Sequence, residues 1–308
     1  YKKKELPHFF KASGVLALAA VVGVCINISN LYHTYEYSKE TMRGKSELKQ
    51  EGAAASQTSS GLDRDYITNW SYGIGETLTL LVPNVKGGGS GSTMSQSEAA
   101  MAKANPMYNG IYSQLPQYFG EQPWTAGPVY VGAFVMFLFV LGCFIVKGPL
   151  KWALLGATIF SILLSWGKNF MGLTDFFIDY VPMYNKFRAV SSILVIAEFT
   201  IPLLAIFALK EILSKPDMLK QEKNCRGVIA ALVLTAGVAL VLAVAPGVFF
   251  SSFITTQEMA ALQQALPAEH LAPFVANLTE MREAIIASDA WRSFFIIVIG
   301  CLFLFLYQ

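Results

Sequence analysis

Three basic side chains, Lys168, Lys186 and Arg188, lie in a short segment between two long apolar runs of the chain. Lys and Arg in short loops normally gather on the cytoplasmic side of a membrane, and this segment is predicted to lie on the opposite side. A cationic cluster on the disfavoured side indicates an anionic ligand, such as the phosphate of a lipid or nucleotide carrier. Contact with lipid headgroups is the alternative interpretation.

Two carboxylates occupy the same segment. Asp175 and Asp179 are four residues apart, so they share one face of a helix, and Pro182 is expected to end that helix. The pattern predicts an interfacial helix followed by a basic turn, a combination that suits an amphipathic lipid phosphate. The alternative is that the two carboxylates only pair with the neighbouring basic side chains.

Glu198 is the one acidic residue predicted deep within a membrane-spanning run. An intramembrane carboxylate is costly unless it is protonated, paired or facing water, so it is a candidate functional group. Pro202, four residues later, frees the carbonyl of Glu198 and predicts a kinked polar notch. A protonated carboxyl bonded to a neighbouring helix explains the same residue structurally.

Aromatic and amide side chains are concentrated in the long segment 32–127. Flat rings stack on the C–H faces of sugars, and amides bind hydroxyl groups, so Trp70, Tyr72, Gln122 and Trp124 are candidate sugar-binding residues. An aromatic belt at the membrane interface is the alternative. The glycine-rich stretch 87–92 beside Lys86 lacks the order of a phosphate-binding loop and is predicted to be a flexible connection.

Six apolar runs are long enough to suggest membrane spans, because about 20 helical residues cross a hydrocarbon core roughly 30 Å thick. They cover residues 9–31, 128–146, 150–166, 190–209, 227–250 and 293–307. The basic residues before the first run, around the tight turn at 147–151 and in the link 210–226 place these connections in the cytoplasm. Segments 32–127, 167–189 and 251–292 are then outside.

The predicted organisation is therefore a first span with a cytoplasmic lead (1–31), an extracytoplasmic loop region (32–127) and a membrane bundle (128–308). The bundle includes the interfacial segment 168–188 and the outer loop 251–292. A net charge of +2 gives no global field for a nucleic-acid partner. The four cysteines and three histidines show no metal-ligand spacing, so neither a metal nor a cofactor is expected.

Three stretches carry a resemblance to a known family. They are Trp70 to Leu78, which includes Glu76, then Gln122 to Gly132, and Tyr184 to Ala189. In this combination the chain resembles the bacterial YfhO-type membrane proteins over most of its length. The resemblance implies an all-α integral membrane protein with a glycosyltransferase fold of the GT-C type, and it implies that the chain is a middle portion of a longer protein. It adds Glu76 to the candidate sugar-binding residues.

The resemblance also implies a function. Such proteins glycosylate cell-envelope polymers or glycolipids from a polyprenyl-phosphate sugar, in the bacterial cytoplasmic membrane. The family's catalytic carboxylate would lie upstream of Tyr1, so no catalytic residue is assigned. The expected partners are the lipid-linked sugar, membrane lipids and the envelope acceptor. Two alternative functions stay open: a lipid or solute transporter or flippase, and a non-catalytic subunit of envelope assembly.

Overall fold

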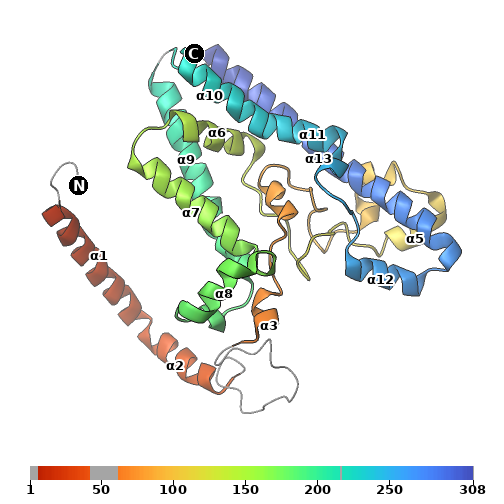
Figure 1. The fold of residues 1–308 in the computed structure, drawn as a ribbon, viewed down its shortest axis with the longest axis horizontal. Coiled ribbons are helices and arrows are strands. Elements are labelled where there is room, and N and C mark those ends of the chain that lie inside the picture. The colour runs from red at the N-terminus through yellow and green to blue at the C-terminus, as the bar shows by residue number, and fades with distance from the viewer. Residues whose placement is uncertain (1–5, 42–61, 216, 308) are drawn as a thin grey trace. The chain divides into compact units, whose positions relative to one another are not determined.

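The computed structural model describes residues 6–41, 62–215 and 217–307, and these residues form helices and turns without a named strand (Figure 1). The prediction of an all-α fold is confirmed. The chain divides into two compact units, one of residues 1–67 and 178–188 and one of residues 68–177 and 189–308. We describe each unit by itself.

The smaller unit contains α1 (Leu6–Ile26) and α2 (Ile28–Lys39), and most of α3 (Arg64–Thr68). Helix α1 is apolar and has no buried residue. Its length and hydropathy make it a candidate membrane span, which agrees with the first predicted span. The small and polar residues 52–61, whose composition predicts a flexible link, and the basic residues 2–4 lie outside the described residues.

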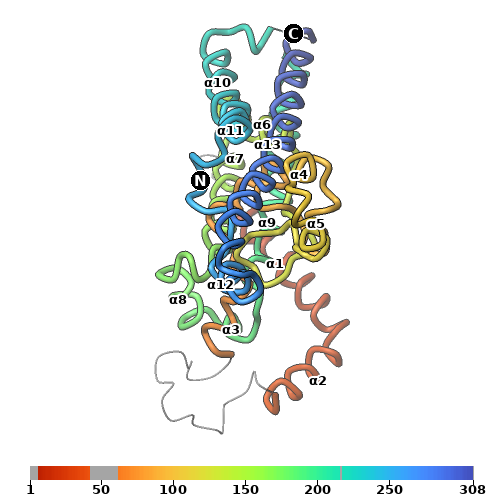
Figure 2. Tube along the Cα trace, turned by 90° about the vertical axis from the view of Figure 1, so that its right-hand side faces the viewer, coloured from red at the N-terminus to blue at the C-terminus, as the bar shows by residue number. Residues whose placement is uncertain are grey.

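The larger unit holds the remaining apolar helices. They are α6 (Ala133–Ile145), α7 (Pro149–Ser165), the short turn η6 (Val190–Leu194) with α9 (Val195–Ser214), α10 (Glu222–Leu232), the π-helical turn η7 (Val233–Gly237), α11 (Val238–Val244) and α13 (Ala268–Tyr307). Figures 1 and 2 show α13 running along α11 in the opposite direction, and α13 also contacts η7. Each of the six predicted apolar runs overlaps with one of these helices or with α1.

Helix α9 packs between α6 and α7 through one face. Its buried residues recur every three or four positions, which is the period of a single helical stripe: Ala197, Ile201, Leu204, Ala208 and Ile212. Gly142 of α6 allows close approach, because a Cβ there would lie 3.1 Å from Leu204 Cγ. Thr158 of α7 and Thr200 of α9 share a buried hydrogen bond of 2.7 Å.

The predicted number of about six membrane spans is higher than the number of helices that are long enough to cross a membrane. Among the described residues, four helical stretches are long and apolar enough to cross a membrane, and a bent pair, if it is one span, raises the number to five. The four are Leu6–Ile26, Val190–Ser214, Glu222–Val244 and Ala268–Tyr307. Helix α6 has only 13 residues, about 20 Å of rise, because the predicted second span begins with a non-helical segment. These apolar helices indicate a membrane protein.

The bent pair joins α7 to the segment Gly167–Tyr180, which includes α8 (Met171–Tyr180) and turns by 110°. Gly167 makes the turn possible, since its φ is +47° and a Cβ would lie 2.1 Å from Ser71 Oγ. The predicted helix around Asp175 and Asp179 is therefore present, and it ends before Pro182 as expected. Its position at a membrane surface stays a prediction.

The segments between the apolar helices fold together into a second core. Residues 68–131 form short helices, namely η1 (Gly75–Leu80), η2 (Met94–Gln96), α4 (Glu98–Met101), η3 (Pro106–Tyr108) and α5 (Asn109–Tyr112). The predicted outer loop 251–292 is instead α12 (Thr256–Ala265) and the N-terminal part of α13. Phe274 of α13 packs on Tyr108 and Tyr112, with ring centroids 5.1 and 5.8 Å away.

The glycine-rich stretch 87–92 is a defined turn, contrary to the prediction of a flexible connection. Gly87 has φ +82° and lies so close to the next segment that a Cβ would be 1.8 Å from the carbonyl oxygen of Gln117. The amide of Phe119 donates to the carbonyl of Lys86 at 3.0 Å, and the amide of Gln117 donates to the carbonyl of Ser92 at 2.7 Å. These bonds place Lys86 beside residues 117–119.

Candidate ligand-binding cavity

A cavity of about 740 Å³ opens in the larger unit, and we call it the main cavity. It is lined by the loop residues 115–116 and 118–123, by the segment from Ser252 to Glu258, and by Lys86, Ser90 and Lys168. Its size is in the range of small-molecule and cofactor sites. Lys168 follows the end of α7 and Ser252 follows α11, so the main cavity lies at one end of the helical bundle.

Lys86 lies on aromatic rings in the wall of the main cavity. Its Nζ is 4.2 Å from the ring centroid of Phe250 and 4.9 Å from that of Phe119. Among the described residues, no carboxylate forms an ion pair with Lys86. Burial lowers the pKa of this ammonium group below its ordinary value, although Glu76 and Glu121 raise it in part. The arrangement leaves a desolvated cation whose charge an anionic ligand would satisfy.

Lys168 adds a second cation to the lining of the main cavity. Its backbone amide donates to Ser71 Oγ at 2.8 Å, which fixes the start of the turn that follows α7. The neighbouring Asn169 donates from Nδ2 to Glu121 Oε2 at 2.8 Å and to the carbonyl of Tyr72 at 3.0 Å. Glu121 is thereby held by an amide, and no ion pair to Lys168 is found in the described part of the chain.

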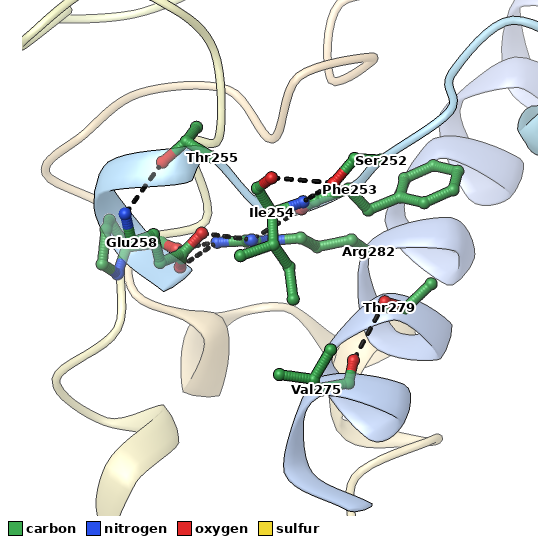
Figure 3. Close-up of polar contacts among 9 residues, drawn as sticks. Ser252, Phe253, Ile254, Thr255, Glu258, Val275, Thr279 and Arg282 are labelled. Carbon is green, nitrogen blue, oxygen red and sulfur yellow. Dashed lines mark hydrogen bonds and ion pairs between the residues drawn. The ribbon is translucent and has the colours of Figure 1, made fainter. Parts of the chain in front are cut away.

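Glu258 is the other carboxylate of the lining, and its charge is compensated from behind by Arg282 (Figure 3). The guanidinium is fully buried and donates to both carboxylate oxygens at 2.7 Å. It also donates to the carbonyl of Phe253 at 2.7 Å and lies 4.8 Å from the ring centroid of Phe119. Because the Glu258–Arg282 pair is neutral, the two positive charges of Lys86 and Lys168 exceed the one negative charge of Glu121. The lining of the main cavity therefore favours anions.

Glu76 is buried behind the wall that carries Lys86. Its Oε1 accepts a hydrogen bond of 2.5 Å from Tyr118 Oη, and its Oε2 accepts one of 2.6 Å from the amide of Gly73. Burial raises the pKa of this carboxyl. Gly120 is required here, because a Cβ would lie 2.0 Å from Glu76 Oε1. Glu76 therefore holds the loop that forms the cavity, and it is absent from the cavity lining.

The other predicted sugar-binding residues are distributed around the same loop. Gln122 lines the main cavity and accepts a hydrogen bond from Ser191 at 3.2 Å. Trp70 donates from Nε1 to the carbonyl of Trp124 at 3.1 Å, and the Trp124 ring is exposed. Tyr72 is buried, with its hydroxyl 2.5 Å from Thr79 Oγ1. Of these four residues, Gln122 alone lines the main cavity.

The predicted phosphate-binding residues belong to different units. Lys168 is in the larger unit, whereas Lys186 and Arg188 are in the smaller one. Arg188 donates to Tyr66 Oη at 2.9 Å and lies over its ring. Within the smaller unit Asp179 forms an ion pair of 2.8 Å with Arg64, and Asp175 is in the larger unit. The proposed role of these residues stays a prediction.

Glu198 lies in the first turn of α9 and is exposed on its surface. Within the stretch Val190–Ser214 it is closer to the middle than to either end, and its functional role stays a prediction. The helix continues through Pro202. Within the described residues no group of three or more histidine, cysteine, aspartate or glutamate side chains is arranged to hold a metal ion.

No protein-family model, curated protein or solved structure matches this chain. The fold and the cavity define a class: an all-helical membrane protein with a polar, cation-lined cavity at one end of its bundle. Sequence reasoning missed three residues of this site. Lys86 was set aside with the glycine-rich stretch, and Glu258 and Arg282 were assigned to a loop. An arginine flanked by Leu278, Met281 and Ile285 at helical spacing was the signal for a buried cation that needs a carboxylate.

Proposed function

We propose that this chain is part of a membrane glycosyltransferase that holds a polyprenyl-phosphate sugar in the main cavity. The observation that supports the proposal best is the pair of lysines, Lys86 and Lys168, on a cavity in which the charge of Glu258 is already compensated by the buried Arg282. Phosphate is the part of such a donor that these lysines would bind. The position of the cavity at one end of the bundle suits a ligand with an apolar tail.

The remaining polar lining suits the sugar. Glu121 and Gln122 present a carboxylate and an amide, which bind hydroxyl groups, and Ser90 adds a hydroxyl. In the transfer, an acceptor hydroxyl would lose its proton to a carboxylate base, its oxygen would attack the anomeric carbon, and the lipid phosphate would leave. Lys86 and Lys168 would stabilise the charge that develops on the leaving phosphate. We assign no residue as the base.

Binding of a defined donor to the purified chain tests the proposal. Polyprenyl-phosphate glucose in detergent micelles serves as the probe, with polyprenyl phosphate and neutral polyprenol as comparisons. We expect Lys86→Met and Lys168→Met each to weaken binding by roughly tenfold, about 1.4 kcal/mol. Lys103→Met is the matched control, since Lys103 is an exposed lysine of the same unit outside the cavity.

Comparison of the three lipids separates the contribution of the phosphate to the binding affinity from that of the sugar. Tighter binding of the phosphate than of the polyprenol indicates recognition of the anion, and tighter binding of the glucosylated donor than of the phosphate indicates recognition of the sugar. Equal binding of all three lipids, or equal effects of the Lys103 and Lys86 variants, would overturn the proposal.

A further inference from the structure

Glu121 differs from the other carboxylate in the lining of the main cavity. Glu258 forms an ion pair with Arg282, whereas no cation in the described part of the chain forms an ion pair with Glu121. Glu121 is also exposed, while the Glu258 side chain is only 15% exposed. The negative charge of Glu121 is therefore available to a ligand that enters the main cavity.

The carboxylate of Glu121 is held in place from two sides. Asn169 Nδ2 donates to its Oε2 at 2.8 Å, and the same nitrogen donates to the carbonyl of Tyr72 at 3.0 Å. On the other side the backbone approaches closely, because a Cβ at Gly73 would lie 3.1 Å from Glu121 Oε1. A side chain held in this way loses little conformational freedom when a ligand binds, which favours its use in recognition.

The charges of the lining limit the charge of the ligand. Lys86 and Lys168 contribute two positive charges and Glu121 one negative charge, while the Glu258–Arg282 pair contributes none, so the net charge is +1. The phosphodiester of a lipid-linked sugar carries a single negative charge, which balances this sum. A carboxylate on the sugar would add a second negative charge beside Glu121. Glu76, buried behind the wall, can only add to that repulsion.

We propose that Glu121 determines which sugar the main cavity accepts. Its carboxylate accepts hydrogen bonds from the hydroxyls of a neutral sugar and repels sugars that carry a carboxylate of their own, such as uronic acids. Specificity of this kind depends on a repulsive contact as well as on an attractive one. The inference rests on the proposed function and deepens it, because it defines the class of sugar in the same cavity.

Two donors that differ only in the sugar test the inference. Polyprenyl-phosphate glucose and polyprenyl-phosphate glucuronate are titrated calorimetrically into the purified chain in the same micelles, with neutral polyprenol as the reference. We expect the wild type to bind the glucose donor about tenfold more tightly than the glucuronate donor, a difference of about 1.4 kcal/mol.

Glu121→Gln is the decisive variant. It removes the charge and keeps an oxygen that can accept the hydrogen bond from Asn169, so the geometry of the wall is retained. We expect the preference for glucose to fall below roughly threefold, through tighter binding of the glucuronate donor. A variant that is merely misfolded would bind both donors more weakly, so this gain separates selection of the sugar from a structural role.

Glu280→Gln is the charge-matched control, since Glu280 is an exposed carboxylate of α13 that does not line the main cavity, and it should keep the wild-type preference. Equal binding of the two donors by the wild type, both tighter than polyprenol, would overturn the inference and leave the proposed function standing. Binding of neither donor more tightly than polyprenol would remove both. No gain for glucuronate in Glu121→Gln, or the same gain in Glu280→Gln, would also overturn the inference.

Discussion

Arg282 and Lys86 both lie against the ring of Phe119, but a carboxylate binds Arg282 in a fork and none among the described residues binds Lys86. The charge on the Arg282 side of the main cavity is complete, because Glu258 accepts two bonds of 2.7 Å from the guanidinium, although the buried Arg282 Nε has no hydrogen-bond partner among the described residues. The Lys86 side is incomplete. Two cations beside one ring thus have different roles, since a compensated charge stabilises the fold and an uncompensated one is available to a ligand.

The largest expected effect is on stability, and it comes from removing the carboxylate that compensates Arg282. Glu258→Gln leaves the buried guanidinium of Arg282 without its counter-charge, which should destabilise the chain by about 3–5 kcal/mol. Thermal unfolding in detergent measures the change, with Glu280→Gln as the control. Adding Arg282→Met to the first variant should restore much of the loss, because both charges are then removed. A loss below about 1 kcal/mol in the single variant would contradict the comparison.

Glu76 holds the loop that forms the Lys86 side of the main cavity, and its substitution tests this role. Glu76→Ala removes the acceptor for Tyr118 Oη and for the amide of Gly73, and both donors are then left buried. We expect a loss of about 2–3 kcal/mol in the free energy of unfolding. Glu76→Gln should cost less, since its amide oxygen keeps one of the two bonds. Equal unfolding temperatures for the wild type and the alanine variant would show that this carboxylate does not hold the loop.

Lys86→Met should act on binding and stability in opposite directions. Loss of the Lys86 ammonium group should weaken the affinity for a polyprenyl-phosphate sugar by roughly tenfold. Removal of this desolvated charge should leave the unfolding temperature at neutral pH unchanged or raise it. Calorimetry and thermal unfolding on the same preparation give both values. A Lys86 variant that is as unstable as Glu258→Gln would remove the distinction between the two cations.

The pH dependence of donor binding sharpens the same distinction. Burial lowers the pKa of Lys86 from its ordinary value of 10.5, so the folded chain loses this proton at a lower pH than the unfolded chain does. Stability therefore rises, and affinity for an anion falls, as the pH increases through the lowered pKa toward 10.5. Titration of donor affinity between neutral pH and pH 10 tests this, and in Lys86→Met the decline should be absent over that range.

The smallest effect is expected from the bond that fixes segment 121–124. Trp70→Phe removes the indole N–H that donates to the carbonyl of Trp124 and keeps an aromatic ring, so the cost should be about 0.5–1.5 kcal/mol. Donor affinity should change by less than threefold, since Trp70 does not line the main cavity. A loss of affinity as large as that of Lys86→Met would indicate that the ring contacts the sugar.

Sequence periodicity predicted the helices better than the site. Long apolar runs lead directly to α1, α9 and the later helices, because the period of buried residues is local in the sequence. The number of spans was overestimated since hydropathy does not mark where a helix starts, as the non-helical residues before α6 illustrate. The sequence of segment 251–292 predicts a loop, and the segment is helical, because the polar residues that surround the buried face of α13 hide its periodicity.

The candidate site depends on contacts between distant residues. Lys86 and Lys168 line one cavity although 82 positions separate them, and neither has a local pattern that predicts the other. Gln122 and Lys168, which composition and charge placement predict as site residues, line the same cavity because loops at one end of a bundle meet, and their roles in binding stay predictions. Tyr72, predicted from the chemistry of its ring, and Glu76, predicted from the resemblance, are buried in the loop's interior, where their polar groups form hydrogen bonds within the protein.

Helix α13 gives the molecule a mechanical property. Its 40 residues extend about 60 Å, roughly twice the thickness of a hydrocarbon core, and its only interior proline, Pro273, precedes Arg282. From Arg282 to Tyr307 it can act as one stiff lever with its apolar end in the lipid. Because no proline interrupts this stretch, a change in the tilt of its apolar end would displace Arg282, and with it one wall of the main cavity, as part of the same rigid helix.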